Sequence, residues 1–130
     1  MRKALIPPGM EWVENDWRMS PGLIAGDYVF LTGFTGQRLD GYMSPDPAEQ
    51  ITTAFDYIEQ VLAEGGMTFA DVVDVTSFHV GLQDHKDVFR RIWEDRVVRP
   101  YPAWTAIEVA GFITPGSFIE VKVVARRRDV

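Results

Sequence analysis

The feature that most constrains this fold is an amphipathic segment between residues 46 and 66. It opens with Asp46-Pro47-Ala48-Glu49, which supplies a helix N-cap, a proline at the first helical position and an acid in the first turn. Gly65-Gly66 ends the helical pattern. Its apolar side chains share one stripe of the predicted helix, at Ile51, Ala54, Phe55, Ile58, Val61 and Leu62. A helix with one apolar stripe needs a second layer against which to bury it.

That second layer is predicted to be a β-sheet whose first strands precede the helix. Residues 19–25 and 28–34 are apolar and β-prone, and Gly26-Asp27 between them supplies the positive-φ residue that a two-residue hairpin turn needs. Residues 72–80 are rich in β-branched side chains, which favour a strand. Residues 1–16 follow neither the helical nor the strand period, so they are predicted to be an irregular lead-in.

A second amphipathic helix and two further strands complete the predicted fold. The helix begins near Asp84, its expected cap, and ends before Pro100. Its shared apolar face is formed by Val88, Phe89, Ile92, Trp93 and Val97. The β-prone runs 100–110 and 118–125 flank a Gly/Pro loop and are predicted to be paired or neighbouring strands. The expected architecture is α+β, a mixed sheet with two helices on one face in the order β-β-α-β-α-β-β, forming one domain over residues 1–130.

Composition argues against several classes of protein. A chain of 130 residues with 46% hydrophobic content suits one compact core. The absence of cysteine excludes disulfides, thiolate metal sites and a thiol nucleophile. The 13 basic and 19 acidic residues give a net charge of −6, which opposes nucleic-acid binding, and the basic run 126–128 is interpreted as a solvated tail. Neither a signal peptide nor a membrane span is evident, so a soluble cytoplasmic protein is expected.

The histidines provide no recognisable metal or hydrolase motif. His79 and His85 are the only two, and neither lies with acids at a metal-binding spacing. Both are therefore interpreted as structural, and no metal or cofactor is predicted. Ser77 and His79 share a face of the predicted strand, but no third member of a nucleophile triad is evident, so a Ser/His hydrolase is given little weight.

Glu120 is the leading candidate for chemistry because bulky apolar residues surround it in the last predicted strand. A carboxyl group in an apolar cleft has a raised pKa and can act as a general base; the alternative is a surface carboxylate beside Lys122. Trp104 is expected on the same sheet face, the one that the helices leave uncovered, and its alternative role is simple packing. A large half-apolar sheet face normally requires a partner, which favours a closed oligomer.

The C-terminal third of the chain also resembles a known signature. Pro102-Ala103-Trp104-Thr105, followed by a Gly/Pro loop and the run from Ile119 to Ala125, is similar to the signature of the RidA/YjgF family, which usually reads Pro-Ala-Arg-Ser/Thr. The resemblance spans about residues 17–126. It implies a RidA-like, chorismate-mutase-like fold, a homotrimer with ligand clefts between subunits, no cofactor, and hydrolysis of reactive enamines or imines with release of ammonia.

The same resemblance assigns roles to individual residues. In the family pattern the arginine binds the substrate carboxylate, and the glutamate at the position of Glu120 helps to place or activate water. Trp104 replaces that arginine here, and an indole cannot make the bidentate charged hydrogen bonds of a guanidinium, so simple 2-imino acids are expected to be poor substrates. The other positions that fall near the family's cleft are Trp17, Arg18, Gly33, Phe34 and, by a looser alignment, Arg90.

Two functions therefore remain open from the sequence. The first is a hydrolase for an enamine, an imine or a related reactive metabolite, with Glu120 handling water and Trp104 stacking on the substrate. The second is a non-catalytic trimer that binds a small metabolite in the same cleft. A ribonuclease, a label that the family has carried, is disfavoured by the acidic charge and by the lack of a His/Lys constellation.

Overall fold

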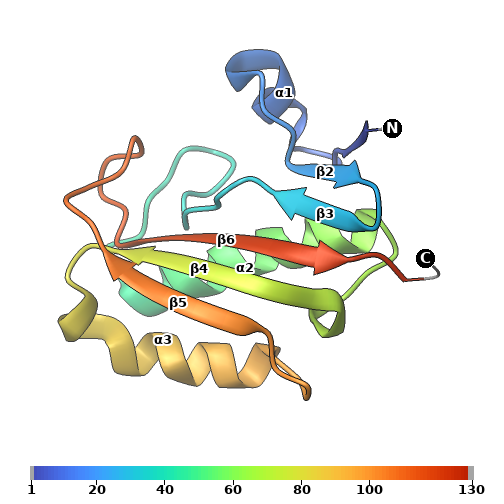
Figure 1. The fold of residues 1–130 in the computed structure, drawn as a ribbon. Coiled ribbons are helices and arrows are strands. Elements are labelled where there is room, and N and C mark those ends of the chain that lie inside the picture. The colour runs from blue at the N-terminus through green and yellow to red at the C-terminus, as the bar shows by residue number, and fades with distance from the viewer. Residues whose placement is uncertain (1, 129–130) are drawn as a thin grey trace.

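One mixed six-stranded sheet organises the structure, a computed structural model that describes residues 2–128 (Figure 1). The elements in chain order are β1 (Arg2–Leu5), α1 (Glu11–Trp17), β2 (Gly22–Ala25), β3 (Tyr28–Leu31), α2 (Pro47–Glu64), the short 3₁₀ helix η1 (Phe69–Asp71), β4 (Val72–His79), α3 (Leu82–Arg96), β5 (Ala103–Glu108) and β6 (Ile119–Arg126). The predicted α+β class is confirmed, and so is a mixed sheet with two long helices on one face.

The strands lie in the order β1-β2-β3-β6-β4-β5, in which only the β4–β5 pair is parallel. The predicted hairpin between β2 and β3 forms around Gly26, whose φ is 63°. The expectation that the last two strands pair or neighbour each other is wrong, because β4 lies between β5 and β6. The loop between them, residues 109–118, exceeds the two to five residues, roughly, that join paired strands, and it carries the chain past the end of β4.

The lead-in predicted to be irregular contains two elements. Strand β1 pairs antiparallel with β2, and the short helix α1 buries Val13 while Met10 is buried just before it. A seven-residue helix shows too few turns for a helical period to emerge from the sequence, and isolated helices of that length are unstable in water. Packing against the rest of the chain therefore stabilises α1, which the sequence pattern alone does not reveal.

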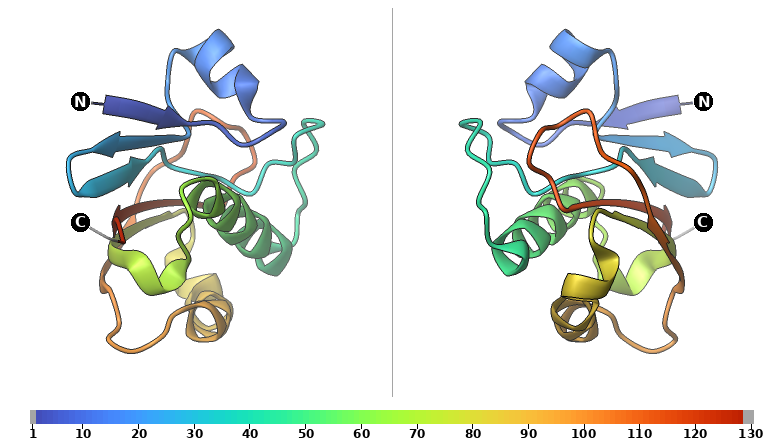
Figure 2. Two further views of the ribbon diagram at one scale, coloured as in Figure 1. Left: turned by 90° about the vertical axis from the view of Figure 1, so that its right-hand side faces the viewer. Right: turned by 90° about the vertical axis from the view of Figure 1, so that its left-hand side faces the viewer.

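Helices α2 and α3 cover the same side of the sheet (Figure 2). The Asp46 carboxylate caps α2 by accepting from the Ala48 amide at 3.1 Å, as predicted, and the whole predicted apolar stripe of α2 is buried. Phe89 and Trp93 of α3 are buried as well. Asp84 does not cap α3, because Gly81 occupies that position with a positive φ and the Glu108 carboxylate accepts from the Leu82 amide at 3.0 Å.

Trp104 and Glu120 lie on opposite faces of the sheet, so the expectation that they share its uncovered face is wrong. The Trp104 ring stacks on Trp93 and Phe89 of α3, with ring centroids 4.8 and 5.5 Å apart, and its Nε1 donates to Ser77 Oγ at 2.9 Å. On β6 the residues on either side of Glu120 are buried beneath the helices, which places Glu120 on the other face. Alternation along a strand identifies which residues share a face, but it does not say which face meets the helices.

No helix covers the other face of the sheet in the part of the chain described, and several large side chains there remain accessible. Tyr28 and Phe30 of β3 and Ile107 of β5 each expose more than two-fifths of their surface. Among residues 2–128, no helix combines the length and the apolar character needed to cross a membrane. The open face of the sheet therefore carries accessible apolar surface, and Tyr28 and Phe30 lie on the strand beside β6.

Candidate functional site

A β-bulge positions Glu120. Phe30 of β3 pairs with Val124 of β6, and further along the chain Phe34 pairs with Val121. The chain therefore advances four residues on one side, from 30 to 34, and three on the other, from 124 to 121. An extra residue of this kind interrupts the ladder and redirects nearby groups. It brings the backbone of Gly33 against the Glu120 side chain, where a Cβ added to Gly33 would lie 2.6 Å from Oε2 of the carboxylate.

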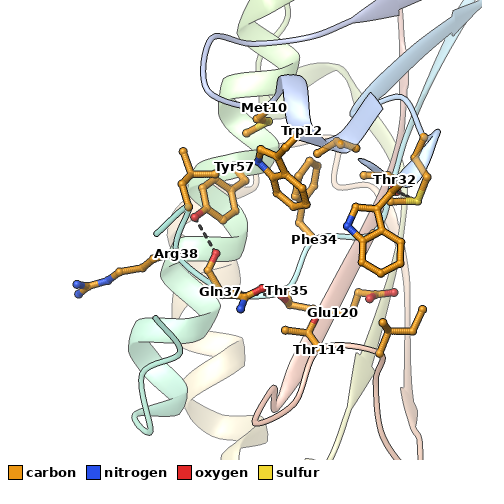
Figure 3. A pocket seen from close by; sticks show the side chains of 16 residues that line it. Met10, Trp12, Thr32, Phe34, Thr35, Gln37, Arg38, Tyr57, Thr114 and Glu120 are labelled. Carbon is orange, nitrogen blue, oxygen red and sulfur yellow. Dashed lines mark hydrogen bonds between the residues drawn. The ribbon is translucent and has the colours of Figure 1, made fainter. Parts of the chain in front are cut away.

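A pocket of about 300 Å³ opens beside this carboxylate (Figure 3). Its walls come from α1, from the chain that follows β3, from α2 and from the loop between β5 and β6. The aromatic and sulfur-containing side chains that line it are Met10, Trp12, Trp17, Met19, Phe34 and Tyr57. The polar side chains are Thr32, Thr35, Gln37, Arg38, Thr114 and Glu120. The site thus combines one carboxylate with walls that are mostly apolar.

Burial raises the pKa of Glu120 above the ordinary value of a glutamate, and the positive charge of Lys122 opposes this rise. The Lys122 ammonium group donates to the Leu31 carbonyl at 3.0 Å. The other charged residue of the pocket, Arg38, forms an ion pair with Glu49 and stacks on Tyr42, with its guanidinium carbon 4.8 Å from the ring centroid. Glu120 is therefore a carboxyl group poised to take up a proton nearer neutral pH than an exposed glutamate.

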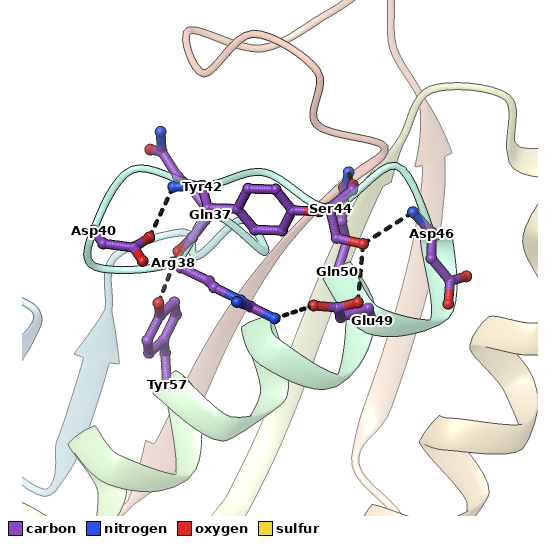
Figure 4. A network of polar contacts seen from close by, with 9 residues as sticks. All are labelled: Gln37, Arg38, Asp40, Tyr42, Ser44, Asp46, Glu49, Gln50 and Tyr57. Carbon is purple, nitrogen blue, oxygen red and sulfur yellow. Dashed lines mark hydrogen bonds and ion pairs between the residues drawn. The ribbon is translucent and has the colours of Figure 1, made fainter.

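A network of polar contacts holds the loops around the pocket (Figure 4). Gln50, fully buried in α2, donates to the Ser44 carbonyl at 2.7 Å and to the Gly116 carbonyl at 3.0 Å. Its side-chain oxygen accepts from the Phe118 amide at 2.8 Å. The Tyr57 hydroxyl donates to the Gln37 carbonyl at 2.7 Å. Helix α2 consequently anchors both loops that border the pocket, residues 37–46 and 109–118.

Four of the residues predicted from sequence meet in this pocket: Trp17, Gly33, Phe34 and Glu120. Arg18 lies in a separate hollow with Lys122. Arg90 lies on the exposed surface of α3, where it pairs with Glu94 at 3.8 Å. Trp104 packs against α3 and does not line the pocket of its own chain. The structure therefore brings together four of the seven predicted positions and leaves apart Arg18, Arg90 and Trp104.

Sequence reasoning missed the lining residues that come from the lead-in and the loops. Trp12 and Met10 belong to the segment that was predicted to be irregular, and Tyr57 was counted neither in the apolar stripe of α2 nor off it. The usable signal was the pair Trp12 and Trp17, two large aromatic residues in a segment with no other apparent role. Exposed fractions of 42% and 53% for these two side chains fit a binding surface better than a core.

A second polar cluster lies beneath the sheet, on the side covered by helices. His79 Nε2 is 2.7 Å from Ser77 Oγ, and His79 Nδ1 is 3.2 Å from Nε2 of His85. The structure thus supplies a third member beside Ser77 and His79 that sequence reasoning did not find. Burial, with the charge of His85 as a second cause, lowers the pKa of His79 to about 4. Ser77 and His79 are 0% exposed, so no substrate can reach them and the cluster is structural.

Metal binding finds no support in the geometry. Within residues 2–128, no group of three or more histidine, aspartate or glutamate side chains is arranged to hold an ion. Glu120 is the one carboxylate among the pocket's lining residues in the described part of the chain.

Comparison with known proteins covers nearly the whole chain. The family model described as Endoribonuclease L-PSP matches residues 14–127. RutC family protein YjgH from Escherichia coli K12 is 37% identical over 126 residues, which cover 96% of this chain and 95% of that protein. A solved structure of protein YJGH superposes with a TM-score of 0.89 at 35% identity, over 99% of this chain and 98% of the other. A Mycobacterium tuberculosis protein described as a member of the highly conserved YjgF/YER057c/UK114 family gives 0.81 at 25% identity, over 97% and 99%.

Proposed function

The chain belongs to the YjgF/RidA family, whose model carries the description Endoribonuclease L-PSP, and from this premise we propose that it hydrolyses a small reactive imine or enamine. The observation that carries the proposal is the position of Glu120. Its carboxyl group has a raised pKa, lies against the backbone of Gly33 at a β-bulge, and faces a pocket large enough for a small metabolite. A perturbed carboxyl group in a cleft is the expected signature of a general base.

The proposed reaction needs one proton acceptor and one water molecule. Glu120 takes a proton from water as the water oxygen adds to the imine carbon, and passes this proton to the nitrogen, which gives a carbinolamine. Glu120 then takes the hydroxyl proton of the carbinolamine and delivers it to the nitrogen as the carbon–nitrogen bond breaks, which releases ammonia and leaves a carbonyl compound. An enamine substrate first takes a proton on carbon and enters the same sequence as the imine. A raised pKa suits Glu120 to both halves of this exchange, since it gives and takes a proton readily.

The proposal includes assembly into a homotrimer. The open sheet face exposes Tyr28 and Phe30 on the strand beside β6 and Ile107 on β5, and a second copy of the chain would cover this surface. Ile113 at the rim of the pocket is 84% exposed, which suits an edge that a neighbouring subunit closes. Light scattering coupled to gel filtration tests this directly, and a monomer at micromolar concentration would contradict it.

A specific observation supports a second candidate, a trimer that binds a small metabolite without turning it over. Trp104 stands where the family pattern has an arginine, and its ring is engaged with α3. A substrate would then lose the charged group that orients its carboxylate, and catalysis depends on such orientation.

Ammonia release across a panel of imines, with Glu120→Gln as the comparison, separates the two candidates. We expect turnover by the parent and a loss of about a hundredfold or more in the variant, because the amide keeps the size of the side chain but cannot take a proton. Ligand binding without ammonia release by the parent would favour the binding protein. Equal turnover by parent and variant would remove Glu120 from the chemistry.

A further inference from the structure

Among the lining residues in the described chain, the pocket offers no cation that is free of an ion pair. Glu120 is the acidic residue and Arg38 the basic residue among those that line the pocket in the described chain. Arg38 already forms an ion pair with Glu49. The nearby cations Arg18 and Lys122 line a different hollow, and the Lys122 ammonium group is engaged by the Leu31 carbonyl. A carboxylate on a ligand would therefore approach Glu120 without an unpaired cation from the pocket of its own chain.

The walls of the pocket are suited to the opposite charge. Trp12, Trp17, Phe34 and Tyr57 present aromatic surface, and Met10 and Met19 add polarisable sulfur. Aromatic faces attract cations, with indole the strongest, and thioethers pack well against rings. Figure 3 shows the Trp12 ring and the Glu120 carboxylate lining the same cavity from different elements. An aromatic wall with one carboxylate is the arrangement expected for an organic cation with an apolar body.

We infer that the pocket selects imines that lack a carboxylate, carried as iminium cations on an aromatic or similarly bulky apolar group, over anionic 2-imino acids. The inference rests on the function proposed above and specifies its substrate class. Glu120 and the two pocket tryptophans are the residues that set the selectivity, through ion pairing and through ring contact respectively.

The chemistry balances for such a substrate. An iminium ion, RCH=NH₂⁺, and water give an aldehyde, RCHO, and ammonium, NH₄⁺; the carbon–nitrogen bond breaks and no electrons are transferred. The positive charge already activates the carbon towards water, so Glu120 needs only to accept the water proton and return it to nitrogen. One class of reaction that supplies such a substrate is the two-electron oxidation of a primary amine to its imine, with a two-electron acceptor such as a flavin taking the electrons.

Two substrates that differ only by a carboxylate test the selectivity. A flavin amine oxidase converts phenethylamine to its imine, and L-amino-acid oxidase converts L-phenylalanine to the corresponding 2-imino acid, in each case with catalase present. The imine that survives is trapped by semicarbazide, so clearance by the protein lowers the trapping signal. We expect the carboxylate-free imine to be cleared at least tenfold faster. Equal clearance, or faster clearance of the 2-imino acid, would overturn the inference while leaving hydrolysis intact.

A binding measurement separates failure of the inference from failure of the proposed function. Phenethylammonium and 3-phenylpropanoate have similar bodies and opposite charges, and each is titrated against the intrinsic tryptophan fluorescence of the full-length protein. At least tenfold tighter binding of the cation, with neither imine cleared, would support the ligand class and reject hydrolysis. Equal affinity or a preference for the anion would reject the ligand class.

Matched variants identify the residues responsible. Trp12→Leu and Trp17→Leu should each weaken phenethylammonium binding about three- to thirtyfold, the range expected for loss of a cation–π contact. Glu120→Gln should reduce the preference for cation over anion towards unity. Tyr101→Leu is the control, because Tyr101 is an exposed aromatic residue outside the pocket. Unchanged binding in both tryptophan variants would overturn the role of the aromatic wall.

Discussion

The Glu120 carboxylate occupies the space that a side chain on Gly33 would need, since a Cβ on Gly33 would lie 2.6 Å from Oε2. Gly33→Ala should therefore displace the carboxylate while leaving the sheet intact, because the group that must move is the end of a flexible side chain. We expect turnover to fall by about tenfold or more, with a change of about 1 kcal/mol or less in the free energy of unfolding.

The control for this prediction is Gly111→Ala. A Cβ at Gly111 meets nothing within 4 Å and the backbone there has an ordinary φ, so this variant should match the parent in both assays. Activity assays and urea unfolding of the two variants side by side provide the comparison. Full activity in Gly33→Ala would show that the position of Glu120 does not matter.

Gln50→Leu should destabilise the protein and loosen the pocket together. The variant leaves the Ser44 and Gly116 carbonyls and the Phe118 amide without the partner that Gln50 supplies. At about 1 kcal/mol for each buried hydrogen bond, a loss of about 3 kcal/mol in the free energy of unfolding is expected. Urea unfolding measures it, and the exposed Gln60→Leu is the control on the same helix. A variant as stable as the parent would show that the loops are held by other contacts.

The buried histidines should make the protein sensitive to acid. The pKa of His79 is lowered from 6.5 to about 4, with His85 and the Glu108 carboxylate among the ionisable groups around the pair. The unfolded chain therefore binds a proton more readily than the folded chain between these values, and stability is lost as the pH falls from 6.5 to about 4. At about 1.4 kcal/mol per pH unit, the loss reaches about 3 kcal/mol.

The contribution of His79 to this loss of stability is measured by urea unfolding of the parent and of His79→Gln at a series of pH values. The glutamine can keep a hydrogen bond to Ser77 but does not titrate in this range, so the variant should lose less stability in acid. An identical acid response in both proteins would assign the effect to other groups.

Trp104→Arg should not create a carboxylate-binding site in the pocket of the same chain, although it restores the family pattern. The side chain at this position lies against Trp93 and Phe89 and contacts Ser77, on the face opposite Glu120. Replacing the stacked ring with a charge should cost about 3 kcal/mol of stability. Trp104→Phe is the conservative control, with an expected loss of about 1 kcal/mol from the hydrogen bond. A stable arginine variant that clears 2-imino acids faster than the parent would contradict this account of the tryptophan.

Sequence predicted the elements that local chemistry determines. Helix α2 follows from the Asp46 cap, Pro47 and a complete apolar stripe, and the hairpin around Gly26 follows from its turn residues. These signals act over a few neighbouring residues, so they survive without knowledge of the rest of the fold. The family resemblance added a proposed role for Glu120 in handling water and placed Gly33 near the cleft. Both residues line the same pocket in the structure.

The relations that sequence did not predict depend on contacts between distant segments. Strand β4 lies between β5 and β6, and its Val75 pairs with both Trp104 and the buried Val123, which places Trp104 on the face covered by the helices. Trp104 was therefore assigned to the wrong face. The contact of His85 with His79 likewise depends on how α3 packs against β4, so it cannot be predicted from the spacing of the two residues in the sequence.

The bulge between β3 and β6 is a surplus of one residue, four steps facing three. Removing that surplus, by deleting Thr32, would let the two strands run in unbroken register and would carry the backbone at Gly33 away from Glu120. The resulting sheet would be more regular, and the Gly33 backbone would no longer fix the position of the Glu120 carboxylate in the pocket. In this chain the number of residues between Phe30 and Phe34 therefore determines whether the backbone reaches the Glu120 side chain.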